Sequence, residues 1–140
     1  MSWDVLIVNT PVSIDLERDK GIDFSSKQEV IDKLTAFFKD IDFSDPSWGI
    51  LDNIKANIEF NLGDDDNIGD NFLLHVRGGE DPVGEIVRMC LAYHWQVFDS
   101  GLDRFIDLSN PKLNSYEQWH EYKEQIFSKP LEEKPWWKFW

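Results

Sequence analysis

The stretch ANIEFNL, residues 56–62, alternates apolar and polar side chains, and FLLHVR, residues 72–77, continues the alternation. Successive side chains of a β-strand point to opposite faces of the sheet, so each stretch predicts a strand with one buried face. Residues 63–71 between them, GDDDNIGDN, contain two glycines and four aspartates. Because glycine and aspartate favour turns, the whole region predicts a β-hairpin with a long loop.

The polar face of this hairpin is the first candidate site. Matching the two buried faces allows a register with Glu59 opposite His75 and Asn57 opposite Arg77. A carboxylate beside a histidine and an arginine could act as an acid/base pair with an anion clamp. The alternative is a solvated face whose charges pair across the strands, and an exposed face of this kind is also a place for a partner to dock.

The other predicted elements follow from hydrophobic spacing and capping signals. Ser26 and Glu29 form a capping-box pattern, and Asp81-Pro82 is a typical helix start. Residues 42–49, DFSDPSWG, are predicted to be a turn. We expect an interior strand at 3–8, helices at 26–39, 82–93 and 114–127, and a second hairpin with strands at 95–99 and 104–107.

These elements predict an α+β fold in the order β-α-(β)-β-β-α-β-β-α. It would have a mostly antiparallel sheet of about five to six strands, with three helices covering one face. The chain has 140 residues, which is a usual length for one domain. We expect a single α+β domain over residues 1–128 and a C-terminal tail over 129–140.

The tail holds Trp136, Trp137, Phe139 and Trp140. We expect it to pack over an apolar patch of its own domain, dock on a partner or lie at a membrane interface.

Negative charge is concentrated between residues 40 and 81. That window holds eleven acidic residues against two bases, so it carries most of the net charge of −13. Such a field favours a basic partner or serves solubility. It argues against nucleic acid and anionic membranes as direct targets, because both require Lys and Arg to neutralise phosphate.

Signals for metal, cofactor or nucleophilic chemistry are weak. His75, His94 and His120 are isolated from one another, and the Asp64–Asp70 loop lacks the glutamate of a calcium-binding loop. Cys90 falls on the apolar side of its helix, where a buried thiol is the usual finding. Arg77-Gly-Gly could cradle phosphate before a helix, but the acidic residues that follow would repel it. We therefore expect no cofactor, no metal and no enzymatic activity, in a cytoplasmic protein without a signal peptide.

Five short motifs together carry a resemblance to a known family. They are MSWD at 1–4, SDPSWG at 44–49, IEFNLG at 58–63, LLHVRGG at 73–79 and FIDL at 105–108. In this combination, over residues 1–127, the chain resembles a family of small acidic bacterial proteins without an assigned function. By size and charge such proteins are also similar to immunity proteins that neutralise bacterial toxins, which is an analogy.

The function expected from the sequence is therefore protein binding, most concretely by an immunity protein that masks a basic toxin. A small-ligand domain or minor enzyme using Glu59, His75 and Arg77 is one alternative, and acidity for solubility alone is another. The candidate partner-binding residues are Asp45, Glu59, Asp64, Asp65, Asp66, Asp70, His75 and Arg77.

Overall fold

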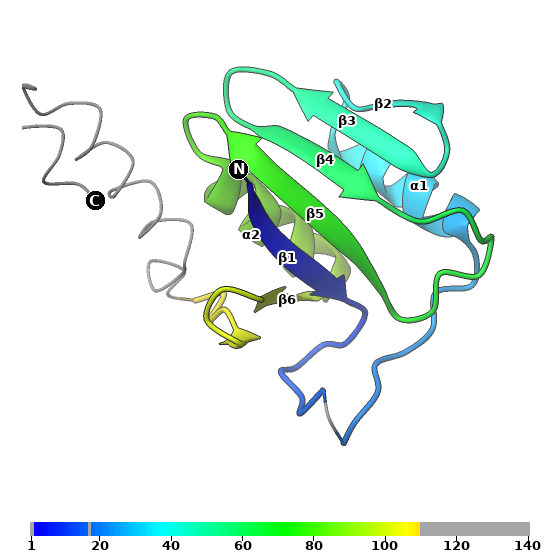
Figure 1. The fold of residues 1–140 in the computed structure, drawn as a ribbon, viewed down its shortest axis with the longest axis vertical. Helices are drawn as coiled ribbons and strands as arrows, with labels where there is room; N and C mark the ends of the chain where they lie inside the picture. Colours follow the sequence, from blue (N-terminus) through cyan, green and yellow to red (C-terminus); the bar gives the residue numbers. More distant parts are fainter. Residues whose placement is uncertain (1, 17, 110–140) are drawn as a thin grey trace, which may run out of the picture.

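An antiparallel sheet of seven strands forms the body of the protein over residues 2–16 and 18–109, which are the residues that the computed structural model describes (Figure 1). The strands lie side by side in the order β2-β3-β4-β5-β1-β6-β7. Two helices accompany them in this part of the chain. The elements are β1 Trp3–Val8, α1 Lys27–Phe37, β2 Asp42–Asp45, β3 Trp48–Asp52, β4 Asn57–Asn61, β5 Asn71–Gly78, α2 Pro82–Tyr93, β6 Gln96–Asp99 and β7 Arg104–Phe105.

The predicted central hairpin is present as β4 and β5. Glu59 lies opposite His75, which confirms that half of the expected register. Asn57, however, lies opposite Gly78 and not opposite Arg77, because an irregularity in the pairing falls between Asn57 and Ile58. An extra residue on one strand of this kind is a β-bulge, which period-2 alternation does not reveal.

The predicted fold class is wrong in its details, although its α+β character is confirmed. The described residues form seven strands and two helices, where five to six strands and three helices were expected. The prediction of a turn over 42–49 is the main source of the difference. Only the segment around Pro46 and Ser47 turns, and strands flank it on both sides. The third predicted helix, 114–127, and the tail, 129–140, lie outside the described residues.

Pairing within the sheet explains why residues 42–49 form strands despite their turn-like composition. β3 pairs with β4 along its whole length, from Trp48 opposite Asn61 to Asp52 opposite Asn57. The ring of Phe43 on β2 lies where a side chain at Gly49 would be, so the glycine is covered by an aromatic neighbour. These contacts are non-local, and they outweigh the local preference of Asp, Ser, Pro and Gly for a turn.

Both helices begin at the predicted caps. The Ser26 hydroxyl accepts a hydrogen bond from the Glu29 backbone N–H at 3.1 Å, and the Glu29 carboxylate accepts from the Ser25 N–H at 2.9 Å. The Asp81 side chain accepts from the Gly84 N–H at 3.0 Å, and Pro82 starts α2 as expected. Each cap satisfies backbone donors that the first helical turn leaves without a partner.

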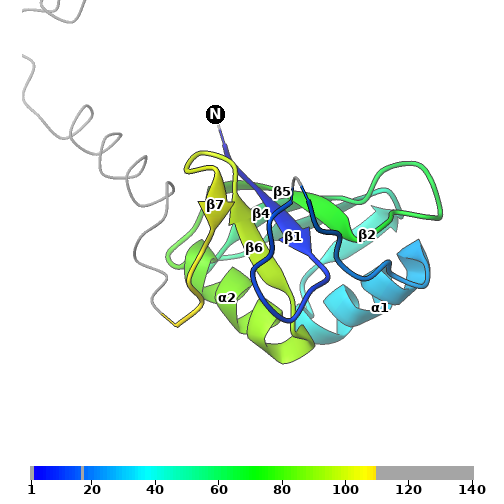
Figure 2. The same ribbon diagram turned by 90° about the horizontal axis from the view of Figure 1, so that it is seen from below.

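The core lies between the sheet and the two helices, which both cover the same face of the sheet (Figure 2). Alternate residues of β4 and β5, such as Phe60 and Leu74, are fully buried there. Trp95 closes one end of the core, with its ring edge-on to Phe24 and Phe72 at centroid distances of 5.6 and 5.7 Å. The opposite face of the sheet carries the polar side chains of the hairpin, so the helices do not hide the first candidate site.

Candidate functional site

The uncovered face of the sheet carries a row of interacting side chains over four neighbouring strands. We call it the open-face row. Its residues come from β3, β4, β5 and β1, and their positions follow from the antiparallel registers of these strands. The members are Trp48, Glu59, His75, Arg77 and Asp4.

Glu59 occupies the middle of the open-face row and accepts two hydrogen bonds. The Arg77 Nε–H donates to one carboxylate oxygen, and the Trp48 indole N–H donates to the other at 3.1 Å. The bond from Arg77 lowers the pKa of Glu59 below its ordinary value, with a further contribution from Trp48, although partial burial opposes the change. Glu59 is therefore an ionised, well-anchored acceptor and a poor proton donor near neutral pH.

His75 pairs with Asp4 of β1 and not with the glutamate opposite it. The His75 Nδ1 lies 2.8 Å from an Asp4 carboxylate oxygen, and the same oxygen accepts from the Ser2 hydroxyl at 2.7 Å. Because the carboxylate only accepts, Nδ1 carries the proton in this contact. Burial would raise the pKa of Asp4, but the bonds from Ser2 and His75 and the charge of Arg77 lower it below the ordinary value.

Sequence reasoning therefore found three of the five members, Glu59, His75 and Arg77, and missed Asp4 and Trp48. An interior strand is expected at 3–8, and Asp4 is not among the expected site residues. Trp48 falls within residues 42–49, where a turn is expected. In both cases a polar or aromatic residue alternating with buried neighbours was the available signal.

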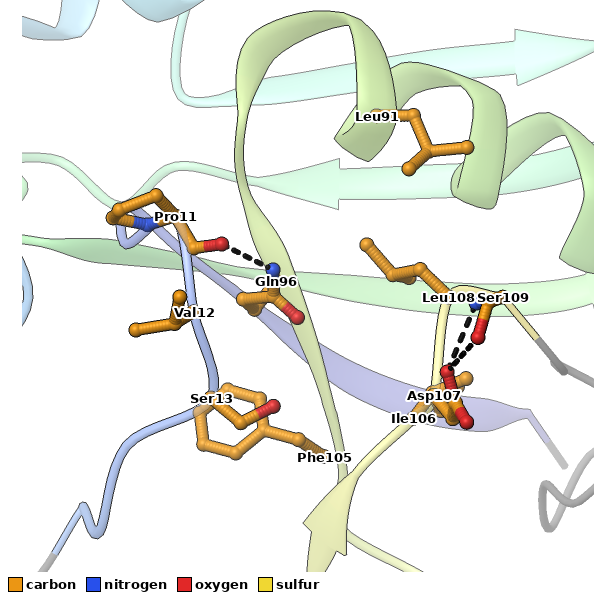
Figure 3. A pocket seen from close by; sticks show the side chains of 10 residues that line it. All are labelled: Pro11, Val12, Ser13, Leu91, Gln96, Phe105, Ile106, Asp107, Leu108 and Ser109. Atoms are coloured by element: carbon orange, nitrogen blue, oxygen red, sulfur yellow. Dashed lines mark hydrogen bonds between the residues drawn. The ribbon is translucent and has the colours of Figure 1, made fainter.

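The open-face row resembles the arrangement of a general base, because a carboxylate orients the imidazole of His75. A site for chemistry also needs a cavity that holds a substrate. Two cavities lie beside β6 and β7, toward the β7 edge of the sheet, and Figure 3 shows the first. None of the five members lines either cavity.

The second candidate site is the loop between β4 and β5, and the structure joins two other loops to it. The N–H groups of Gly21, Phe24 and Lys27 donate to the side chain of Asp70, the carbonyl of Gly69 and the carbonyl of Asp66, respectively. The turn between β2 and β3 is tied to the same end by the Leu62 N–H, which donates to the Ser47 carbonyl. We call this the acidic end, comprising Asp23, Asp45, Asp64, Asp65, Asp66 and Asp70.

The acids of this end differ in what they do locally. Asp45 and Asp65 each accept a hydrogen bond from the backbone N–H two residues on, which stabilises their turns. Asp70 holds Gly21 at 2.8 Å and is structural. Within the described residues, the exposed side chains of Asp64 and Asp66 make no hydrogen bond or ion pair. The negative charge of these two carboxylates is therefore not offset by an ion pair within the described structure.

The local field at the acidic end favours cations. Lys20 pairs with Asp23 at 3.0 Å, and its pKa is raised by the hydrogen bond and charge of Asp23 and by the charge of Asp70. Lys27 is buried beneath the loops, where its ammonium donates to the Ser47 hydroxyl at 3.2 Å. The acidic end thus favours the charged form of one exposed lysine.

The predicted partner-binding residues do not form one surface. Asp45, Asp64, Asp65, Asp66 and Asp70 come together at the acidic end, while Glu59, His75 and Arg77 belong to the open-face row. The structure therefore separates the candidates into two groups, one of them made of loops and the other of strands.

We also searched the described part of the chain for a metal site, a reactive thiol and a membrane-spanning helix. That part contains no group of three or more His, Cys, Asp or Glu side chains able to hold a metal ion. Cys90 is buried, and burial raises the pKa of its thiol, so it is not a reactive nucleophile. None of the helices in residues 2–16 and 18–109 is long and apolar enough to cross a membrane.

The fold and these two sites define an α+β protein with a one-sided antiparallel sheet and a loop-built acidic end. Comparison with protein-family models, with curated proteins and with solved structures found no match to the chain.

Proposed function

We propose that this protein is a binding domain whose acidic end captures a basic protein. The observation that supports this most directly is the gathering of six carboxylates from three loops. Two of them, Asp64 and Asp66, make no side-chain bond to any residue that the structure describes. Repulsion among such charges weakens the folded state, so a partner that neutralises them is a physical reason for the arrangement.

The distribution of charge along the chain supports the same proposal. Residues 1–109 carry 22 acidic and nine basic side chains, whereas residues 110–140 carry five of each. Six of those nine bases are already in ion pairs within the described structure. A basic partner would meet a surface with few competing cations, and its approach would be accelerated by long-range attraction that salt screens.

The specific form of the proposal is an immunity protein for a basic toxin. Its support is the small size, the acidity and the resemblance to small acidic bacterial proteins that the motifs carry. A nuclease is one such toxin, because an enzyme that binds nucleic acid presents Lys and Arg to phosphate. Carboxylates at the acidic end would then occupy the positions of phosphates.

A second candidate function has one observation in its favour, the oriented imidazole of His75. With Asp4 bound to Nδ1, the other nitrogen could take a proton from a ligand or hold an acidic group together with Arg77. Neither of the two cavities beside β6 and β7 is lined by a residue of the open-face row. We therefore place it after the binding of a basic protein.

The experiment uses the full chain as bait in a lysate of its native host, followed by purification of any basic protein captured. Binding is then measured by calorimetry at low and high salt. Between 50 and 300 mM salt we expect the affinity to fall by about tenfold or more, since screened charges dominate the contact. Expression of the captured protein alone should be toxic to cells, and co-expression with this chain should restore growth.

Two triple variants with the same change of charge test whether the acidic end is the surface that binds the partner. The first is Asp64→Asn, Asp65→Asn and Asp66→Asn, for which we expect at least about tenfold weaker binding. The second, Asp40→Asn, Asp52→Asn and Asp103→Asn, alters exposed acids at the opposite end of the sheet and should weaken binding only about two- to threefold. Equal losses would show that only the net charge matters. Failure to capture a basic protein would leave solubility as the role of the acids.

A further inference from the structure

A groove runs along the β6–β7 side of the sheet, away from the open-face row. It consists of two adjacent cavities of about 510 and 440 Å³, which share Ser13 and Phe105 in their walls. Figure 3 shows Pro11, Val12 and Ser13 on one side of the first cavity and residues 106–109 on the other, with Leu91 of α2 above. Cavities of this size hold aromatic side chains or small ligands.

The groove is lined by apolar side chains that water reaches. Val12, Leu16 and Leu91 are 62%, 36% and 56% exposed, and they are half of the large hydrophobic residues that are exposed in the described part of the chain. Phe105 lies between the two cavities and packs edge-on against Phe98 at 5.4 Å. A concentration of exposed apolar surface around two cavities indicates a docking site and not a random scatter.

We propose that the groove is the docking site for the aromatic segment Pro135–Trp140 of the same chain. The described residues end at Ser109, which itself lines the first cavity. The next 25 residues, 110–134, can span many times the dimensions of the groove. Because the segment is tethered, its effective concentration at the groove is of the order of millimolar, so even weak contacts suffice.

The chemistry of the segment matches that of the groove. Its sequence PWWKFW offers four aromatic rings, which gain most from leaving water. Lys134 precedes the segment and Lys138 lies among its rings. The groove carries Asp15, Asp103 and Asp107 in its walls against one base, Arg104. The proposal is independent of the proposed function, since the groove is built from other residues than the acidic end.

Disulfide trapping in the full chain tests the proposal. Val12→Cys on the groove wall is combined with Phe139→Cys, and oxidation is followed on non-reducing gels. We expect an intramolecular disulfide to form about tenfold faster than in the control, Ile54→Cys with Phe139→Cys. Ile54 is 74% exposed and lies in the turn between β3 and β4, outside the groove. The native Cys90 is buried and does not compete.

A second set of variants tests whether the groove itself, and the segment of the same chain, are responsible for the trapping. Leu91→Asp, which places a charge on the groove wall, should reduce the trapping rate to that of the control pair, while Ile54→Asp should leave it unchanged. Equal rates for the groove and control pairs would overturn the proposal. Trapping that accelerates with protein concentration would instead show the segment of a second copy in the groove, and that outcome would also overturn it.

Discussion

Trp48 and His75 stack across an intervening strand, with their ring centroids 5.5 Å apart and an angle of 21° between the rings. The two residues lie on β3 and β5, and β4 runs between them. The Trp48 indole N–H donates a hydrogen bond of 3.1 Å to the Glu59 carboxylate on β4, and this bond holds the indole over the middle strand. This contact ties three strands of the open face together by side chains in addition to the backbone ladder.

The stack should contribute measurably to stability. A double-mutant cycle with Trp48→Ala and His75→Ala should give a coupling energy of about 0.5–1.5 kcal/mol, as for other aromatic pairs. Urea unfolding followed by circular dichroism measures the four free energies of unfolding. A control cycle with Trp48→Ala and Leu91→Ala, which share no contact, should give less than about 0.5 kcal/mol. Similar couplings in the two cycles would show that the stacking adds nothing.

The ion pair between Arg77 and Glu59 should make stability depend on acid pH. The pKa of Glu59 is lowered in the folded state from an ordinary value of 4.5, so its contribution is fully present above that value. It is lost as the pH falls through the lowered folded pKa. Glu59→Gln should therefore flatten the decrease of unfolding free energy from pH 5 downward.

The same variant should cost roughly 1 kcal/mol or less at neutral pH, because both side chains are partly exposed. Asp64→Asn provides the control, since its side chain has no partner in the described residues. That control should retain the steeper acid dependence of the unmodified chain. An acid dependence of Glu59→Gln identical to that of the control would contradict the assigned ion pair.

Asp70 should be the acid of its loop on which the fold depends. Asp70→Ala removes the acceptor of the Gly21 N–H, bonded at 2.8 Å, and should lower the free energy of unfolding by about 1–2 kcal/mol. Hydrogen exchange at Gly21 should accelerate in this variant. Asp64→Ala in the same loop should change the stability by less than about 0.5 kcal/mol. Equal effects would mean that the tie between the loops is unimportant.

Gly79 should tolerate no side chain. Its φ is 116°, and a Cβ there would overlap the backbone of Lys55 and Ala56. Gly79→Ala should therefore destabilise the protein by roughly 2–3 kcal/mol or more. Gly63→Ala, at φ 77° with open space around it, should cost only about 1 kcal/mol. Thermal unfolding of both variants gives the comparison, and a smaller loss at Gly79 than at Gly63 would be inconsistent with the crowding.

Much of the fold could be predicted from local patterns. The capping signals at Ser26 and Asp81 placed the starts of both described helices, and alternation located β4 and β5. β2 and β3 could not be found this way, because their residues favour turns and become strands only when β3 pairs with β4. The bulge that shifts Asn57 to Gly78 is likewise absent from any alternation pattern.

The candidate sites were predictable to a similar extent. Glu59 lies opposite His75 as expected, yet each side chain bonds to other residues. Glu59 accepts from Arg77 and Trp48, and His75 pairs with Asp4. Two of these partners, Trp48 and Asp4, lie on β3 and β1, the strands that flank the hairpin in the sheet. Asp4 is 71 residues from its partner His75, so no local pattern could have joined them.

The sequence by itself determined the acidity, the central hairpin, the two helix starts and the concentration of aspartates at 64–70, because these depend on composition and near neighbours. Only the tertiary structure decided which acids are structural, as Asp70 is, and which have no partner among the described residues, as is the case for Asp64. It also brought the loop of residues 19–24 against the hairpin loop and completed the acidic end. The physical reason is that closing the long chain between distant loops costs entropy, which the pairing of the strands offsets by holding their ends together.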